Sequence, residues 1–337
     1  MHFLITGHTG FKGAWLTLLL KHRGHQVSGV SLTSENDSLF KRAGVSSVLV
    51  NDITCDIRNF VELEKHFLSI NPDVVIHLAA QSLVCESYLN PIITFETNSM
   101  GTINVLKASQ SVDNLKAQLI ITTDKVYKNV NKSTGYVESD PLGGQDPYSA
   151  SKAMADLATQ SWISSFTNAP TAIARAGNVI GGGDISIDRL MPDLVNHFVL
   201  EQAPKLRAPH SVRPWQHVLD CLNGYLLLVD SLIDKKNEGE WNFGPDDTQI
   251  RTVADVVELS RNYWGASKEW EIDENDHPYE ASLLLLNSNK SRRLLGWNDK
   301  LNFEESVRWT IDWYKKIHQS GDALQETMKN IFEFESK

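Results

Sequence analysis

Three glycines spaced by two residues follow a short apolar run near the start of the chain. Residues 3–5 have the character of a β-strand, and Gly7, Gly10 and Gly13 lead from them into an apolar helical stretch. This spacing lets the backbone turn tightly, approach a pyrophosphate closely and direct helix N–H groups at the anion. A plain strand-to-helix turn is the alternative, but the position at the first strand–helix junction favours a dinucleotide site.

Short β-rich runs alternate with helical patterns through the first half of the chain. The predicted strands span 2–6, 26–31, 48–51, 73–77, 117–122 and 170–175, and the predicted helices span 11–23, 60–69, 91–111 and 148–168. This alternation is typical of a parallel sheet that is covered by helices on both faces. We therefore expect an α/β fold, a Rossmann-type doubly wound parallel sheet.

The pattern loosens after residue 176. The elements predicted there are helices at 188–201, 218–234, 252–263, 289–295 and 303–318, a strand at 241–243 and a helical tail over 321–337. We expect residues 1–176 to form a dinucleotide-binding Rossmann domain with later strands interleaved. Residues 177–337 are expected to form mainly a smaller C-terminal substrate-binding lobe.

Charge and hydropathy exclude several classes of partner. The chain has 42 acidic and 32 basic residues, a net charge of −10, so it lacks the basic surface that nucleic acid requires. No apolar stretch approaches the roughly 20 residues of a membrane span, and the first residues lack a signal-peptide pattern, so a cytoplasmic location is expected. Cys55, Cys85 and Cys221 are widely separated, which predicts reduced thiols and no metal site.

The carboxyl ends of the predicted strands supply the other candidates for a dinucleotide site, because ligands of open α/β sheets lie at that edge. The second strand ends at Ser31 without the acidic residue that usually binds a ribose 2′-hydroxyl and without an arginine for a 2′-phosphate. Ordinary loop chemistry is the alternative for the residues after the third and fourth strands. The candidates are Gly7, Thr9, Gly10, Phe11, Lys12, Gly13, Ser31, Asp56, Ile57, Leu78, Ala79, Ala80 and Gln81.

Tyr148 and Lys152 form a Tyr-x-x-x-Lys motif at the beginning of a predicted helix. One helical turn brings both side chains to one face. An ammonium group beside the phenol, with an oxidised nicotinamide nearby, stabilises phenolate and lowers the pKa of the tyrosine, so that it can act as a base near neutral pH. The spacing alone is common on helices without chemistry, but the glycine loop in the same chain favours a catalytic pair.

The residues after the fifth predicted strand are Thr123, Asp124 and Lys125. This segment resembles the strand end of the sugar-nucleotide 4,6-dehydratases, a family of extended short-chain dehydrogenases/reductases. Lys125, at a position where the dTDP-glucose branch usually has glutamate, is similar to the CDP-glucose branch. The resemblance covers nearly the whole chain, with further matches at 7–15, 79–81, 97–98, 101–102, 142–144, 146–152, 175–184, 188–190, 213–218 and 241–245.

The resemblance implies a chemistry for these side chains. A CDP-glucose 4,6-dehydratase produces CDP-4-keto-6-deoxyglucose by internal hydride transfer through NAD. Tyr148 would take the proton of the sugar 4′-hydroxyl while Thr123 hydrogen-bonds that oxygen. Lys125 would then help to remove the proton on C5′, and Asp124 would protonate the departing 6′-hydroxyl. Lys152, Tyr148 and Asn98 are also implied as contacts of NAD.

The resemblance also implies the substrate contacts and the assembly. The expected substrate contacts are Gln81, Asn178, Arg189 and Arg213. Guanidinium groups match phosphate in a bidentate manner, which suits the two arginines to a diphosphate, although a structural ion pair is the equal alternative for Arg189. The helices at 91–111 and 148–168 resemble those of a homodimer interface. A role in deoxysugar and lipopolysaccharide biosynthesis follows from the same resemblance.

The sequence departs from the family pattern near the expected sugar site. Ser82 and Cys85 stand where family members usually have proline and arginine, so an arginine that would contact an anion is missing. The loop over 130–137 also lacks the usual tryptophan pattern. Three alternatives therefore stay open: another nucleotide-sugar 4,6-dehydratase, a nucleotide-sugar 4-epimerase, and a non-catalytic dinucleotide-binding regulator.

Overall fold

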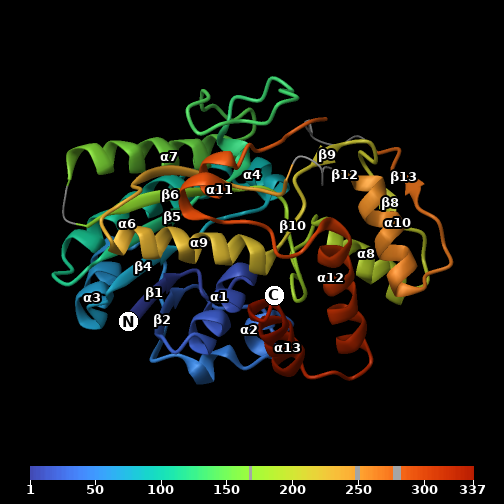
Figure 1. Ribbon diagram of the computed structural model, residues 1–337, viewed down its shortest axis with the longest axis horizontal. Helices are drawn as coiled ribbons and strands as arrows, with labels where there is room; N and C mark the ends of the chain where they lie inside the picture. The colour runs from blue at the N-terminus through green and yellow to red at the C-terminus, as the bar shows by residue number, and fades with distance from the viewer. Residues whose placement is uncertain (167–168, 247–250, 276–281) are drawn as a thin grey trace.

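A seven-stranded parallel sheet forms the centre of the computed structural model, which describes residues 1–166, 169–246, 251–275 and 282–337 (Figure 1). The strand order is β11-β6-β5-β4-β1-β2-β3. Because β1 has β2 on one side and β4 on the other, the order reverses there, which confirms the predicted Rossmann-type sheet. The strands are β1 (His2–Thr6), β2 (Gln26–Ser31), β3 (Asn51–Thr54), β4 (Val74–His77), β5 (Ala117–Ile121), β6 (Thr171–Ala176) and β11 (Gly239–Phe243).

Helices cover both faces of this sheet, and α7 (Pro147–Ser165) and α9 (Val218–Ile233) run along its length (Figure 1). Side chains alternate between the two faces along a strand. Phe3 and Ile5 accordingly pack in the core that contains α1 (Phe11–His22) and α9, whereas Leu4 packs in the core that contains α3 and α6. The helices on that second face are α3 (Phe60–Ile70) and α6 (Gly101–Gln110).

Several short elements lie beyond one end of the sheet. Helices α8 and α10 lie near β8 and β13 at the right-hand side of Figure 1. Strand β11, although it comes from the range 177–337, pairs with β6 inside the central sheet. The remaining elements are α2 (Leu39–Arg42), α4 (Val84–Leu89), α5 (Pro91–Phe95), β7 (Val179–Ile180), α8 (Leu190–Val199), β8 (Lys205–Leu206), β9 (Val212–Arg213), β10 (Gln216–His217), β12 (Arg251–Thr252), α10 (Val253–Trp264), β13 (Glu271–Ile272), α11 (Asn289–Leu295), α12 (Phe303–His318) and α13 (Ala323–Glu335).

Most predicted elements agree with the observed ones to within two residues, but two differ by more. The third strand was expected at 48–51, but β3 is Asn51–Thr54, and Val45–Val48 forms a 3₁₀ turn instead. Strand β3 lies at the sheet edge and is half-exposed, so it needs no continuous apolar run. The helix predicted over 91–111 is interrupted by a π-helical segment, Glu96–Met100, and the end of the helix predicted over 148–168 falls on residues 167–168, outside the described residues.

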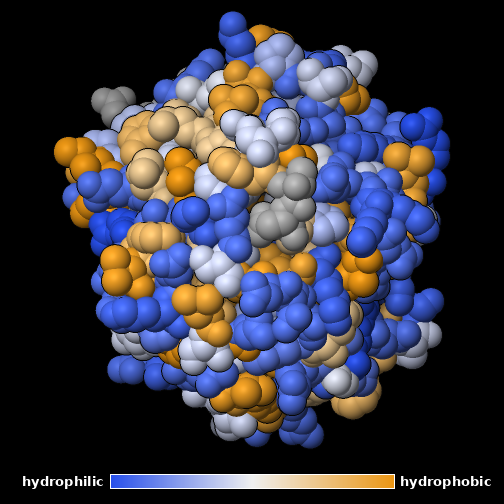
Figure 2. Space-filling model, turned by 90° about the vertical axis from the view of Figure 1, so that its left-hand side faces the viewer, coloured by the Kyte–Doolittle hydropathy of each residue, from blue (hydrophilic) through white to orange (hydrophobic). Residues whose placement is uncertain are grey.

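Figure 2 shows the end of the molecule that lies on the left in Figure 1, where the N-terminus is. This surface is mostly hydrophilic, and its hydrophobic side chains form separate patches rather than one continuous area. Within the described ranges, the helices are too short or too polar to cross a bilayer.

Candidate active site

A cavity of about 510 Å³ lies beyond the carboxyl ends of β5 and β6. The segments that follow these two strands line one side of it, together with the beginning of α7, and residues of α8 and β8 line the other side. Asp124, Lys125 and Tyr148 all contribute to the lining. These side chains, which are far apart in the sequence, therefore open onto one common space, as the predicted chemistry requires.

The glycine loop after β1 has no room for side chains at two of its three glycines. A Cβ on Gly7 would lie 2.6 Å from the amide nitrogen of Ala79, and a Cβ on Gly13 would lie 2.2 Å from the carbonyl oxygen of Gly7. Gly7 also has a φ of +80°, in the left-handed region that favours glycine. The loop therefore lies against the turn after β4, and a pyrophosphate could approach the backbone amides at the beginning of α1.

Hydrogen bonds join this loop to the end of β2. The hydroxyl oxygens of Thr9 and Ser31 are 2.8 Å apart, and Thr9 Oγ1 donates to the carbonyl of Leu32 at 3.1 Å. The structure thus brings together two of the predicted cofactor residues. Lys12 points elsewhere: its ammonium group donates to the Tyr225 hydroxyl at 3.3 Å, and its side chain lines the main cavity.

The other predicted cofactor residues occupy three places near this loop. Asp56 accepts three hydrogen bonds from the Arg58 side chain, at 2.6 Å, 3.0 Å and 3.1 Å, and its pKa is lowered chiefly by this side-chain hydrogen bonding. Ile57 is buried beside Gly101, where a Cβ would lie only 2.5 Å from its Cδ1. The backbone of Leu78 continues the pairing of β4 with β1, and the half-buried residues Ala79 and Ala80 follow it. Phe11, at the beginning of α1, lies beside Gly181.

Asn98 connects the turn after β4 with α7. Its Oδ1 accepts from the Gln81 amide at 2.8 Å, and its Nδ2 donates to the Gln81 carbonyl and to Ser151 Oγ, both at 2.9 Å. The Gln81 side chain is satisfied internally, because it accepts from the Leu83 amide at 2.6 Å and donates to Thr94 Oγ1 at 2.9 Å. The cavity lining includes neighbouring Ser82 rather than Gln81, so the geometry gives no support for Gln81 as a substrate contact.

Asp124 is a buried carboxyl group, with 2% of its surface exposed. Thr123 Oγ1 donates to its Oδ1 at 2.9 Å, while its Oδ2 has no hydrogen-bond partner among the described residues. Burial raises the pKa of Asp124, against the opposing positive charges of Lys125 and Arg213. Burial therefore favours the protonated form, which can donate a proton.

Tyr148 and Lys152 lie on the first turns of α7, as predicted. Lys152 is buried and donates to the Ile121 carbonyl at 2.8 Å, and burial lowers its pKa to about 8. The expected lowering of the pKa of Tyr148 is not found in the protein alone. Burial raises that pKa to about 12, against the opposing effects of the Thr123 hydrogen bond and the charge of Arg189. The free-energy cost of burying the phenolate is larger than the stabilisation that the Thr123 hydrogen bond and the Arg189 charge provide.

The predicted phosphate contacts also line the cavity. Arg189 forms an ion pair with Asp184 at 3.2 Å and donates to Ser82 Oγ at 3.2 Å, so both interpretations of this residue have structural support. Arg213 is 4% exposed and donates to the carbonyl of Val212 at 2.9 Å. Asn178 lines the same space, and its backbone is held by a hydrogen bond within the pairing of β7 and β10.

Sequence reasoning missed Arg207, which follows β8 and lines the cavity. Its guanidinium group pairs with Asp188 and lies 3.9 Å from Cys85 Sγ. A guanidinium group is therefore present beside Cys85, although it comes from another element than in the family pattern. The only sequence signal was a basic residue in the Pro-bearing segment 204–214, and nothing in it indicates contact with a residue 122 positions away.

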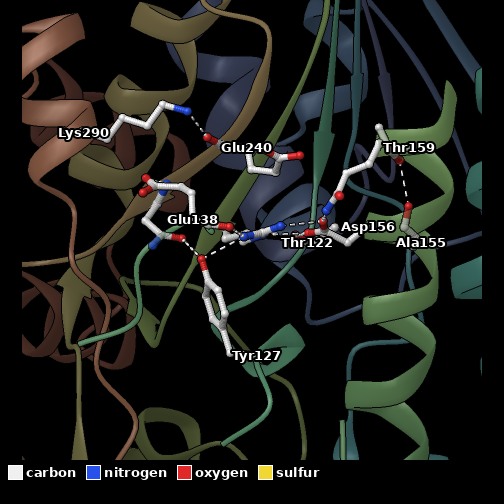
Figure 3. Close-up of polar contacts among 11 residues, drawn as sticks. Thr122, Tyr127, Glu138, Ala155, Asp156, Thr159, Glu240 and Lys290 are labelled. Carbon is white, nitrogen blue, oxygen red and sulfur yellow. Dashed lines mark hydrogen bonds and ion pairs between the residues drawn. The ribbon is translucent and has the colours of Figure 1, made fainter. Parts of the chain in front are cut away.

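A buried polar network joins the elements that carry Tyr148 and Asp124 (Figure 3). Arg175 of β6 and Asp156 of α7 form an ion pair at 2.7 Å, and both side chains are fully buried. Asp156 also accepts from Thr122 at 3.0 Å, and Arg175 donates to the Tyr127 hydroxyl at 2.9 Å. Because these residues belong to α7, β6 and the segment after β5, the network fixes the helix with Tyr148 relative to the strand that leads to Asp124.

Comparison with known proteins agrees with this architecture. A family model described as GDP-mannose 4,6 dehydratase matches residues 4–310. The CDP-glucose 4,6-dehydratase of Salmonella typhimurium is 40% identical over 344 residues, covering 98% of this chain and 95% of that protein. The UDP-glucose 4-epimerase of Halalkalibacterium halodurans is 28% identical over 350 residues, covering 98% of this chain and all of that protein.

A solved structure has the same fold. The dTDP-glucose 4,6-dehydratase DesIV of Streptomyces venezuelae, crystallised with NAD and TYD bound, superposes with a TM-score of 0.81 at 24% identity, covering 96% of this chain and all of that one. The resemblance found in the sequence is confirmed by the length of the family match and by the 40% identity of a full-length relative. The chain belongs to the GDP-mannose 4,6-dehydratase family.

Proposed function

We propose that this protein is an NAD-dependent CDP-glucose 4,6-dehydratase that forms CDP-4-keto-6-deoxyglucose. The observation that carries the proposal is the shared cavity of Tyr148, Asp124 and Lys125, with Thr123 between the phenol and the carboxyl group. The 40% identity to a CDP-glucose 4,6-dehydratase over nearly the whole chain supports this choice of substrate. We also infer a cytoplasmic location and a role in deoxysugar biosynthesis, such as that of lipopolysaccharide.

The residues of the glycine loop fit a dinucleotide. Gly7 and Gly13 leave the backbone bare where a Cβ would clash, so the N-terminus of α1 is open to a pyrophosphate. Thr9 and Ser31 would lie beside the adenosine ribose, and Lys152 and Asn98 would lie at the nicotinamide end. When bound, NAD supplies a reversible hydride acceptor for the carbon that carries the sugar 4′-hydroxyl.

Tyr148 is the proposed base for the 4′-hydroxyl. Because its pKa is raised, the phenolate form requires positive charge nearby. The charge of Arg189 already acts to lower this pKa. The Thr123 hydroxyl would orient the same sugar oxygen. Lys152, with a pKa lowered to about 8, would add an ammonium charge on the next turn of the helix.

Asp124 and Lys125 are the proposed pair for the loss of water. Once C4′ is a ketone, the proton on C5′ is acidic and would pass to Lys125, a step that requires its free amine, while the 6′-hydroxyl leaves with a proton from Asp124. Return of the hydride to C6′ and of a proton to C5′ would then complete the 6-deoxy product. A charged Lys125 opposes protonation of Asp124, but burial outweighs this effect and raises the pKa of the carboxyl group. Asp124 can therefore serve as the acid, since the proton that it donates completes the departing water.

The opposite side of the cavity is the proposed substrate side, formed mainly by residues 177–337. Arg189, Arg213 and Asn178 would hold the diphosphate, because the arginine forks match phosphate oxygens. These groups supply the local positive charge that a chain with a net charge of −10 needs in order to bind an anionic substrate.

A homodimer is proposed from apolar side chains that α4, α5 and α7 leave uncovered. Leu89 is 75% exposed, Ile92 is 73% exposed and Leu157 is 53% exposed. Large apolar residues grouped on neighbouring helices are typical of an interaction surface. Sedimentation equilibrium of the purified protein tests this part of the proposal; a monomer at micromolar concentration would contradict it.

The deciding experiment weighs reaction products. Purified protein is incubated with CDP-, dTDP-, GDP- and UDP-glucose, and the nucleotide sugars are analysed by mass spectrometry. The proposal expects loss of one water from CDP-glucose. An epimerised sugar of unchanged mass would favour a 4-epimerase, the second candidate, since an epimerase relative is 28% identical. Binding of NAD without turnover of any sugar would favour a regulator.

A further inference from the structure

Asp188 and Arg207 form an ion pair in the lining of the main cavity. Asp188 lies just before α8, and Arg207 directly follows β8. Their side chains keep 31% and 38% of their surface exposed, so both remain accessible to a ligand in the cavity. The pair is therefore a preformed combination of one anionic acceptor and one cationic donor.

The neighbours of each arginine in the cavity place this pair away from Tyr148 and Asp124. Besides burial, the charge of Arg189 acts on the pKa of Tyr148 and that of Arg213 acts on the pKa of Asp124. Arg207 instead contacts Asp188 and Cys85, at the side of the cavity that α8 lines. Arg189 and Arg213 thus lie nearer the chemistry, and Arg207 lies farther along the same space.

This order matches the order of groups in a nucleotide sugar. The sugar must lie against Tyr148 and Asp124, and the diphosphate follows it at Arg189 and Arg213. The nucleoside then extends toward Asp188 and Arg207, on the far side of the cavity. The direction of the ligand rests on the proposed function; the accessibility of the ion pair does not.

Local contacts hold both side chains in a fixed orientation. Asp188 has a φ of +62°, in the left-handed region that only a few residue types adopt readily, aspartate and asparagine among them. Arg207 pairs with this carboxylate through Nη2, and its Nη1 lies 3.9 Å from Cys85 Sγ. The acceptor and the donor therefore stand side by side before a ligand arrives.

The pair is complementary to one pyrimidine edge. Cytosine presents an amino donor, N4, next to two acceptors, N3 and O2, which suits a carboxylate beside a guanidinium group. Uracil and thymine present an acceptor and then an N–H donor at the same two positions. Either of these bases would direct an oxygen at the carboxylate and a donor at the guanidinium group, so neither side chain would be satisfied.

We propose that Asp188 and Arg207 read the base and select cytidine nucleotides over uridine and thymidine nucleotides. Asp188 accepts a hydrogen bond from N4, and Arg207 donates to N3 and O2. Adenine shares the first two groups, but it is larger and has no second acceptor at the position of O2. The ion pair is thus the specificity element for the nucleobase of the substrate.

Calorimetric titration with CDP, UDP, dTDP and ADP tests this assignment without requiring turnover. Wild-type protein is expected to bind CDP roughly 10- to 100-fold more tightly than the other three, which is what one well-placed bidentate pair provides. Asp188→Asn turns one acceptor oxygen into an N–H donor that suits the O4 of uracil. The CDP-to-UDP affinity ratio should fall at least tenfold, and asparagine also tolerates the left-handed backbone at this position.

Two further variants complete the test. Arg207→Lys keeps the charge but loses the forked guanidinium group, so it should weaken the binding of CDP without strengthening the binding of UDP. Asp193→Asn removes the same charge from the lining, where Asp193 lies 3.6 Å from His197, and should leave the ratio unchanged. An unchanged ratio in Asp188→Asn, or an equal change in Asp193→Asn, overturns the proposal.

The outcomes separate this inference from the proposed function. If no nucleotide sugar loses water but Asp188→Asn still abolishes the preference for CDP, the dehydratase proposal fails and the base assignment stands. If CDP-glucose is dehydrated and the ratio is insensitive to Asp188, the base assignment fails alone.

Discussion

Thr123 Oγ1 donates a hydrogen bond to Asp124 Oδ1 at 2.9 Å and leaves the other carboxyl oxygen without a partner among the described residues. That second oxygen lies beside Gly177, where a Cβ would come within 3.2 Å of it, and Gly177 also lines the cavity. One oxygen of Asp124 is thus anchored, and the other is buried beside the cavity lining without a hydrogen bond to the described residues. The arrangement suits a carboxyl group that donates a proton.

Asp124→Asn should abolish dehydration and yet stabilise the fold. The amide cannot supply the proton, so kcat should fall by roughly 10²- to 10⁴-fold. Burial raises the pKa of Asp124 in the fold, so the stability present at low pH is lost as pH rises through that pKa, and the amide removes this loss. Activity assays and thermal unfolding at pH 7 measure both effects. Unchanged turnover would exclude Asp124 as the acid.

Lys125→Met should reduce product formation by about 10²-fold or more, because no other amine is proposed to take the C5′ proton. Lys128→Met is a matched control, since Lys128 is exposed and outside the cavity lining. Product is quantified by mass spectrometry after a fixed incubation. If the two variants keep equal activity, Lys125 has no part in the chemistry.

Asp156→Asn should destabilise the protein by about 3–5 kcal/mol, because it leaves the Arg175 charge buried without an anionic partner. Glu258→Gln breaks the surface ion pair with Arg261 and should cost only about 0–1 kcal/mol. Urea denaturation of both variants provides the comparison. Similar losses in the two variants would show that the buried network does not hold α7 against β6.

Gly13→Ala should prevent the glycine loop from closing, since the new Cβ would lie 2.2 Å from the carbonyl oxygen of Gly7. NAD binding by this variant, measured by fluorescence titration, should be at least tenfold weaker than that of the wild type. Gly10→Ala is the control for stability: a Cβ there meets only the Gly7 carbonyl, at 3.4 Å, so the unfolding midpoint should stay near that of the wild type. Normal NAD affinity in Gly13→Ala would contradict the role of this loop.

His217→Phe should make the protein less sensitive to acid. His217 is fully buried between Trp15 and Trp309, and burial lowers its pKa to about 3, from 6.5. Protons bind the unfolded state first, so stability is lost as pH falls from 6.5 toward 3, roughly 2–3 kcal/mol of it by pH 4.5. Urea midpoints at pH 7 and pH 4.5 measure this loss. If the urea midpoint falls equally in the wild type and the variant between pH 7 and pH 4.5, His217 is not the source of the acid sensitivity. Buried His77 is present in both proteins and does not affect this comparison.

Local patterns in the sequence were sufficient to predict the elements whose signals lie within a few neighbouring residues. The termini of α11 and α12 agree with the prediction because capping residues and helical periodicity are local signals. Strand β3 was displaced because an edge strand need not be apolar, and the apolar residues 48–50, just before it, carried the misleading signal. The glycine loop and the Tyr148–Lys152 motif were visible because their spacings are short.

Contacts between distant segments were decided only by the folded chain. The sequence showed a missing arginine at Cys85, whereas the fold brings Arg207 to that position from 122 residues away. It suggested that Lys152 and an oxidised nicotinamide together lower the pKa of Tyr148, whereas in the protein alone burial raises that pKa to about 12.

The sequence by itself determined which chemical groups the protein carries and the order of its strands and helices, because propensity and periodicity act over a few residues. The tertiary structure alone decided which groups share a cavity, how deeply each carboxyl, phenol and ammonium group is buried, and therefore in which protonation state each can act. Burial and long-range pairing depend on the packing of the whole chain, which no short stretch of residues contains.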